Sequence, residues 1–257
     1  MAYDFLMLGT TDRVGWIEYR RPPVNAIHWE MLAEIARAFA ELRDAPETRV
    51  IVFASALERF FTAGAEIGVM AAMSQADLAR WVNACHDLVR QVRASAKPVL
   101  AAIHGTAVGG GLELVLNCDV RFAADTARLG QPEINIAFIP PVGATQSYAR
   151  LLGRPRAIRF LYDGALLTAA EALALGFVDE IVPTDRLRDH VQEYAAGLAR
   201  KPAEALAAIR RCITEGIDRP FEGPAIERAA AVHLTGTPDF AEGLRAFLDK
   251  RPPKWES

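Results

Sequence analysis

The chain has 257 residues, 51% of them apolar, so it can bury a large core as one long domain or as one domain with an appended subdomain. A net charge of −3 does not suggest a nucleic-acid or anionic-membrane partner, and no run of basic residues interleaves with aromatic residues. No apolar stretch of about 18 residues is present, and no basic segment leads into an apolar run near residue 1. We therefore expect a cytoplasmic protein without a targeting peptide or membrane helix.

Short apolar runs alternate with amphipathic segments in the first two thirds of the chain. In the amphipathic segments, apolar residues recur at intervals of three and four, which is typical of helices. This pattern predicts strands at 14–19, 50–54, 99–103 and 120–124, and helices at 29–43 and 75–93. Strands that alternate with helices predict an α/β fold.

After about residue 183 the pattern becomes almost wholly helical. Helices are predicted at roughly 184–200, 203–215, 220–235 and 238–250. Pro202, Pro220 and Pro238 each stand at a predicted helix start, where proline is well tolerated. We predict an α/β core over 1–183 that carries the site, followed by a helical subdomain over 184–257.

Cysteine and histidine show no spacing that would bind a metal. The three cysteines (Cys85, Cys118 and Cys212) form no CxxC pair and are interpreted as small buried side chains in a reducing compartment. The five histidines (28, 86, 104, 190 and 233) are scattered, and we interpret them as structural or surface residues. No metal site is predicted.

Three small residues, Ala63, Gly64 and Ala65, follow the predicted strand at 50–54. Small residues let a ligand approach the backbone, and a following helix would direct free N–H groups at that ligand. The same composition also occurs in ordinary turns. The segment by itself leaves both interpretations open.

A run of three glycines, Gly109 to Gly111, joins the strand at 99–103 to a helix. Such a run leaves backbone N–H groups exposed at a positive helix end. Its spacing is not a clean G-x-G-x-x-G, and no acidic residue closes a second strand, so a dinucleotide site is set aside. Glu113 lies one turn into the helix, either facing a ligand or simply favoured there by the helix dipole.

Glu133 follows a proline and precedes apolar residues in the segment Gly130 to Ile136. A carboxylate in apolar surroundings has a raised pKa and can hold or pass a proton near neutrality. The alternative is a solvated carboxylate in a turn. This segment supplies a second candidate acid beside Glu113.

Taken in order, these segments resemble the crotonase (enoyl-CoA hydratase/isomerase) superfamily. That family carries Phe-x-Ala-Gly-Ala-Asp-Ile, then Gly-x-Ala-x-Gly-Gly-Gly-x-Glu-Leu, then Gln-Pro-Glu, and this chain has near matches at 60–67, 105–114 and 131–133. The resemblance extends over nearly the whole chain, through 21–26, 167–179 and 240–247. One motif would be weak evidence, whereas the ordered set is specific.

The resemblance implies a fold, a reaction and an assembly. The fold is a spiral of repeated β-β-α units with a helical C-terminal region that trimerises, giving a homotrimer or a hexamer (a dimer of trimers). The reaction is hydration of the C2=C3 double bond of a 2-enoyl-CoA thioester to 3-hydroxyacyl-CoA. No cofactor is implied, because coenzyme A is part of the substrate.

The resemblance also implies residue roles. The N–H groups of Ala65 and Gly110 would form an oxyanion hole for the thioester oxygen. Glu113 and Glu133 would position a water beside C3 and handle its proton. The implied substrate- and CoA-binding residues, besides the two of the oxyanion hole, are Val24, Ala26, Ala63, Glu66, Ile67, Pro141, Phe247 and Lys250.

Other members of the same family leave two alternatives. Isomerases rely mainly on the position of Glu133 to move a proton between C2 and C4, and some hydratases act on ring dienoyl-CoA substrates. A non-catalytic or RNA-binding relative is a remote third alternative, which the intact acid pair and the scarcity of lysine disfavour. The acid pair favours hydration.

Pro141 departs from the family pattern, which has glycine there. Proline has no backbone N–H, so a donor that could help to hold the catalytic water is missing. We expect either that another group replaces this donor or that hydration of short linear enoyl-CoA is slow.

Overall fold

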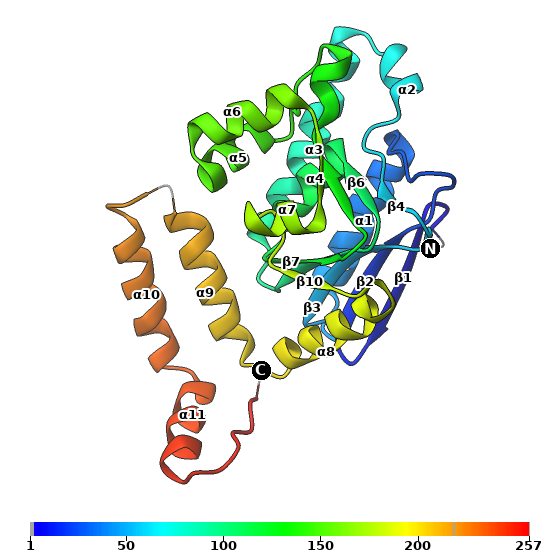
Figure 1. The fold of residues 1–257 in the computed structure, drawn as a ribbon. Helices are drawn as coiled ribbons and strands as arrows, with labels where there is room; N and C mark the ends of the chain where they lie inside the picture. The colour runs from blue at the N-terminus through cyan, green and yellow to red at the C-terminus, as the bar shows by residue number, and fades with distance from the viewer. Residues whose placement is uncertain (1–2, 218, 257) are drawn as a thin grey trace.

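The computed structural model describes residues 3–217 and 219–256, and its core contains two β-sheets (Figure 1). The first sheet has six strands in the order β1-β2-β3-β5-β7-β10. Their bounds are β1 Leu6–Thr11, β2 Val14–Tyr19, β3 Val50–Ser55, β5 Val99–Ile103, β7 Val120–Ala124 and β10 Glu180–Val182. The first two strands pair antiparallel, and every later pairing is parallel.

The second sheet has four strands of three residues each, in the order β4-β6-β8-β9. They are β4 Phe60–Thr62, β6 Thr106–Val108, β8 Arg128–Gly130 and β9 Leu166–Thr168. The chain passes from β3 to β4, from β5 to β6 and from β7 to β8, each time moving from the first sheet to the second and then into helical structure. This repeated β-β-α path is the spiral that the resemblance implies.

Helices fill the remaining connections. Their bounds are α1 Trp29–Asp44, α2 Ile67–Ala71, α3 Gln75–Ala94, α4 Gly109–Val115, α5 Ala144–Leu152, α6 Arg154–Asp163, α7 Ala169–Ala174, α8 Leu187–Ala199, α9 Ala203–Gly216, α10 Gly223–Thr235 and α11 Pro238–Leu248, with 3-10 turns η1 Pro132–Ile136 and η2 Thr184–Arg186. The expected helix start at Pro220 is wrong, because α10 begins at Gly223 and has Pro224 in its first turn. No helix in the described part of the chain is long and apolar enough to cross a membrane.

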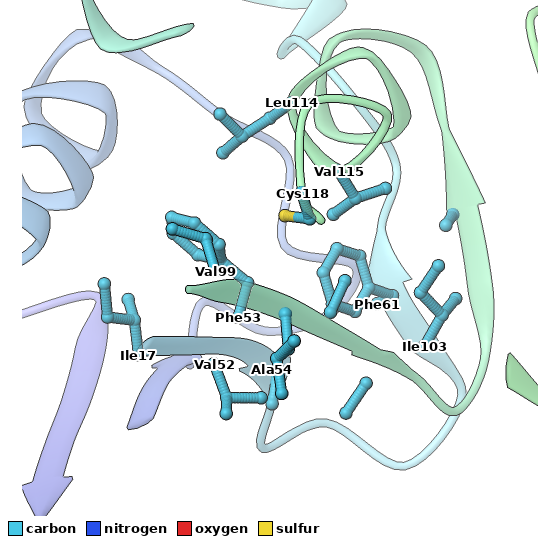
Figure 2. Packing of buried hydrophobic residues seen from close by; sticks show 14 of the residues in the cluster. Ile17, Val52, Phe53, Ala54, Phe61, Val99, Ile103, Leu114, Val115 and Cys118 are labelled. Carbon is cyan, nitrogen blue, oxygen red and sulfur yellow. The ribbon is translucent and has the colours of Figure 1, made fainter. Parts of the chain in front are cut away.

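The hydrophobic core fixes the position of α4, the helix that follows the glycine run. Leu114 and Val115 of α4 and Phe61 of β4 gather with Phe53 of β3 and Val99 of β5 (Figure 2). Of these five residues only Leu114 keeps any accessible surface, and it is 4% exposed. Close packing of this kind allows little displacement, so the N-terminus of α4 is held rigidly against the sheets.

Helix α8 packs against β2, β3, β5 and β7, so it covers the first sheet. Trp16 of β2 also donates a hydrogen bond from Nε1 to Gln192 Oε1 of α8 at 2.8 Å. Helices α9 to α11 extend away from the sheets instead (Figure 1). We therefore propose that the helical subdomain begins after α8 rather than at residue 184.

Candidate active site

Glycines bring two distant segments into contact at the start of α4. Gly64 has φ +80°, and a methyl group there would lie 3.0 Å from the Val108 carbonyl oxygen and 3.2 Å from Gly109 Cα. A methyl group on Gly111 would lie 2.0 Å from the side chain of Thr62, so glycine at this position is required by packing. The segment around Ala65 therefore lies directly against the first turn of α4.

Two backbone N–H groups are left free where these segments meet. Residues 27 and 65 form an isolated parallel bridge, in which the Ile27 N–H donates to Gly64 O at 2.7 Å and the Glu66 N–H donates to Ile27 O at 2.9 Å. The N–H of Ala65 takes no part in this bridge and has no partner among the described residues. Gly110 lies in the first turn of α4, where N–H groups have no partner within the helix, and α4 has no side-chain cap.

A cavity of about 330 Å³ opens beside these two groups. Its walls are mainly apolar side chains from α1 and α3, and it also contains the backbone of the two glycine segments. The lining comprises Ile27, Leu32, Ile35, Ala63, Gly64, Ala65, Ile67, Met70, Leu78, Trp81, Cys85, Leu88, Val89, Val108, Gly109, Gly110, Glu113, Leu114, Pro132, Glu133, Asn135, Ile136, Phe138, Pro141 and Val142. Cavities of this kind typically hold small organic ligands.

Glu113 is buried at this cavity, with 1% of its surface exposed. Its Oε1 accepts a hydrogen bond of 2.6 Å from the Val142 N–H, and its Oε2 has no partner within the described residues. Burial raises the pKa of Glu113 to about 8; the N–H groups of Val142 and Ala144 oppose the rise, and the charge of Glu133 adds to it. Glu113 can therefore keep its proton at neutral pH.

Glu133 is half-buried on the same cavity, and burial raises its pKa as well. The amide of Gln131 is satisfied when its nitrogen donates to both Glu133 oxygens, at 3.0 and 3.1 Å, and its oxygen accepts from the Tyr148 hydroxyl at 3.3 Å. Sequence reasoning missed both partners. The position of Gln131, two residues before Glu133, was an available signal, whereas only the fold brings Tyr148 to the site.

The two carboxylates flank the first turn of α4. A methyl group on Gly109 would lie 3.3 Å from Glu133 Oε1, and one on Gly110 would lie 3.9 Å from Glu113 Oε2. Both acids thus face the position that a group bound to the free N–H of Gly110 would occupy. N–H donors suited to an oxyanion lie here beside a pair of acids able to share one proton, as addition or removal of a proton next to a carbonyl requires.

Val24, Ala26 and Glu66 lie beside the cavity and outside its lining. The Ala63 N–H donates to Val24 O at 2.9 Å, which ties the two segments together. Arg21 donates to Ala26 O at 2.8 Å and forms an ion pair of 2.6 Å with Glu66. Of the expected binding residues in these two segments, the structure places Ala63, Ala65 and Ile67 in the cavity wall.

Phe247 and Lys250 lie far from this cavity within one chain. Phe247 is in α11, Lys250 follows that helix, and α11 lies at the opposite end of the molecule from α2 (Figure 1). The Phe247 side chain is 82% exposed. Neither residue lines the cavity of its own chain.

Pro141 lies in the cavity wall without an N–H, and the peptide group after it makes two hydrogen bonds. Its carbonyl oxygen accepts from His86 Nε2 of α3 at 3.0 Å, and the Val142 N–H of the same peptide donates to Glu113. The interpretation of the histidines as structural or surface residues therefore misses a contact of His86 with the site. No sequence signal indicated it, because His86 and Pro141 are 55 positions apart.

The described residues contain no group of three or more His, Cys, Asp or Glu side chains placed to hold a metal ion. The three cysteines are all free, and Cys118 is buried while Cys85 lies in the cavity wall. Burial raises the pKa of the Cys85 thiol to about 12. Cys85 is therefore a neutral side chain at physiological pH.

Comparisons with known proteins place the chain in a family. The family described as enoyl-CoA hydratase/isomerase matches residues 9–257. A protein of Mycobacterium bovis named as a probable enoyl-CoA hydratase is 33% identical, over 99% of this chain and 99% of its own. A crotonyl-CoA hydratase of Syntrophomonas wolfei is 32% identical, over 98% of this chain and 97% of its own.

Solved structures give the same result. An enoyl-CoA hydratase from Geobacillus kaustophilus superposes with a TM-score of 0.96 at 30% identity, covering 100% of this chain and 98% of the other. An enoyl-CoA hydratase from Bacillus anthracis superposes with a TM-score of 0.94 at 32% identity, covering 98% of this chain and 99% of the other.

Proposed function

The chain belongs to the enoyl-CoA hydratase/isomerase family, and we propose that it adds water across the C2=C3 double bond of a 2-enoyl-CoA thioester to give 3-hydroxyacyl-CoA. The observation that carries this proposal is the acid pair: Glu113 and Glu133 face one apolar cavity beside two free backbone N–H groups. The substrate brings its own coenzyme A, and we propose that no further cofactor is needed.

We propose that the thioester oxygen binds between the N–H groups of Ala65 and Gly110. Negative charge builds on this oxygen as the thioester becomes enolate-like during attack at C3. Donors that are fixed before the reaction stabilise that charge without reorganisation, and Gly110 adds the positive end of the α4 dipole. The packing of Gly64 on Val108 and Gly109 holds the two donors together.

The acids handle the protons of the added water. One carboxylate accepts a proton from the water as its oxygen bonds to C3, and C2 receives a proton from the same acid pair. Because burial raises the pKa of both groups, the pair can share one proton near neutral pH and so has both a base and an acid ready. The net change is the addition of one water molecule.

Isomerisation is the second candidate reaction, in which Glu133 alone moves a proton between C2 and C4. Two observations favour it. Glu133 is oriented by the amide of Gln131, and Pro141 offers no N–H to a catalytic water. Hydration remains the first proposal, because the Oε2 atom of Glu113 is unpartnered and a methyl group on Gly110 would lie 3.9 Å from it.

A panel of enoyl-CoA thioesters tests the function. We expect 2-enoyl-CoA substrates with apolar acyl chains to lose their conjugated absorbance, because apart from Glu113, Glu133 and Asn135 the side chains that line the cavity are apolar or the neutral thiol of Cys85. A 3-enoyl-CoA that gains conjugated absorbance faster than any 2-enoyl-CoA loses it would instead establish isomerisation. Absence of both changes across the panel would contradict the proposed function.

We also propose a homotrimer or a hexamer in the cytoplasm, with coenzyme A bent between 24–26 and 63–67 and reached by Phe247 and Lys250 of a neighbouring subunit. Exposed apolar side chains on α9 and α11 support assembly: Ile209, Ile213, Phe240, Leu244, Phe247 and Leu248 are 41% to 82% exposed. Light scattering should give the mass of three or six chains. A stable monomer at micromolar concentration would contradict the assembly and leave the reaction untouched.

A further inference from the structure

We propose that His86 is a positioning residue for Glu113 and acts through the peptide group between Pro141 and Val142. This inference rests on the proposed function, in which Glu113 is one of the two acids. His86 belongs to α3 and lies outside the cavity lining.

The geometry joins His86 and Glu113 through a single peptide. His86 Nε2 lies 3.0 Å from the Pro141 carbonyl oxygen, and the N–H of the same peptide unit, carried by Val142, lies 2.6 Å from Glu113 Oε1. A carbonyl oxygen can only accept, so His86 must carry its proton on Nε2. The order of donation is therefore His86 to Pro141 carbonyl, and Val142 N–H to Glu113.

This arrangement acts on Glu113 in two ways. A hydrogen bond to an amide oxygen polarises the amide and makes its N–H a stronger donor, because bonds in a chain reinforce one another. It also fixes the rotation of the peptide plane, while the proline ring restricts φ at position 141. Both effects hold the carboxylate of Glu113 in one orientation at the cavity.

Glu113 has few other groups to stabilise its charge. The titratable groups that act on it or with it are Glu133 of η1, Cys85 of α3 and Tyr148 of α5, each neutral or negative. Stabilisation of the ionised form comes from backbone N–H groups, of which Val142 contributes most. Weakening that one donor should therefore raise the pKa of Glu113 further.

The test compares three substitutions at position 86. Leu cannot donate, and Asn keeps an amide that is too short to reach, whereas Gln carries an N–H donor at a reach similar to that of His Nε2. We expect His86→Leu and His86→Asn to lower kcat about tenfold, the scale of one weakened hydrogen bond, with less than about a threefold change in KM. His86→Gln should retain most of the wild-type kcat.

The pH profile gives a readout that packing alone would not change. The pKa of the acid pair should rise in His86→Leu and His86→Asn, and it should keep its wild-type value in His86→Gln. Asn83→Leu is the matched control, since Asn83 is exposed on the same helix. It should leave kcat and the profile unchanged.

Two results would overturn the proposal. The first is an equal loss of kcat in His86→Gln and His86→Leu, which would show that His86 has only a packing role. The second is a wild-type kcat and pH profile in His86→Leu. A carbon-13 NMR titration of the Glu113 carboxyl in each variant reads the same pKa without substrate. It therefore decides the role of His86 even if no thioester in the panel reacts, and a variant that fails to fold is replaced by the other non-donor.

Discussion

Glu113→Gln and Glu133→Gln should each lower kcat by at least about 10²–10³, the usual scale of lost general acid–base catalysis. Glutamine preserves the size and polarity of each side chain but can neither accept nor give up the proton. The cavity and the free N–H groups of Ala65 and Gly110 remain, so KM should change much less. Steady-state rates on the best thioester of the panel measure both parameters.

The double variant adds a test of whether the two acids act as a unit. Substitutions of residues that share one proton do not have additive effects on kcat. The double variant Glu113→Gln/Glu133→Gln should therefore have a kcat little lower than that of either single variant. Glu58→Gln is the matched control, because Glu58 is an exposed carboxylate outside the cavity lining. A near wild-type kcat in either single variant would rule out the two-acid mechanism.

The longer strands were predictable because burial leaves a clear trace in the sequence. β3 and β5 are continuous apolar runs of the kind that parallel, doubly covered strands need, and both lie where they were predicted. The strands of the second sheet have only three residues, too few to show an alternating pattern. β1 was missed because most of its residues face solvent and only Leu6 of the strand is buried.

The site could be predicted from short sequence segments rather than from single residues. The two glycine segments and both acids were predicted from the sequence, and the structure places Ala65, Gly110, Glu113 and Glu133 at one cavity. These residues could be predicted because a glycine run, or an acid among apolar residues, is a local pattern in the sequence. The contacts that orient the acids are not local, and no property of residues 86 or 148 alone indicates that they reach the site.

The contacts of the turn at Pro141 could likewise not be predicted from the sequence. The sequence identified a missing N–H and left open whether another group takes its place. In the structure the next N–H along the chain, that of Val142, donates to Glu113 itself, with the carbonyl of Pro141 held by His86. A donor at this turn thus serves the acid directly.

Gly109→Ala should lower kcat roughly tenfold, although the change adds only one methyl group. Gly109 has φ +59°, which disfavours any side chain, and the methyl group would lie 3.3 Å from Glu133 Oε1 and 3.4 Å from Gly64 Cα. The Glu133 carboxylate would therefore have to move by a few tenths of an ångström, whereas 3.4 Å is an ordinary contact distance to Gly64. A displacement of about 1 Å at a reacting centre costs about 10² in rate, so the smaller shift of Glu133 should cost roughly tenfold.

Gly153→Ala separates backbone strain from displacement of the site. Gly153 also has a positive φ, +73°, but a methyl group there meets no atom within 4 Å, and the residue lies outside the cavity lining. Both variants should therefore lower the melting temperature, while only Gly109→Ala should lose most of its kcat. If Gly109→Ala keeps wild-type kcat, the first turn of α4 does not set the distance between Glu133 and the N–H of Ala65. If Gly153→Ala loses activity as well, strain alone accounts for the effect and the contact with Glu133 has no separate role.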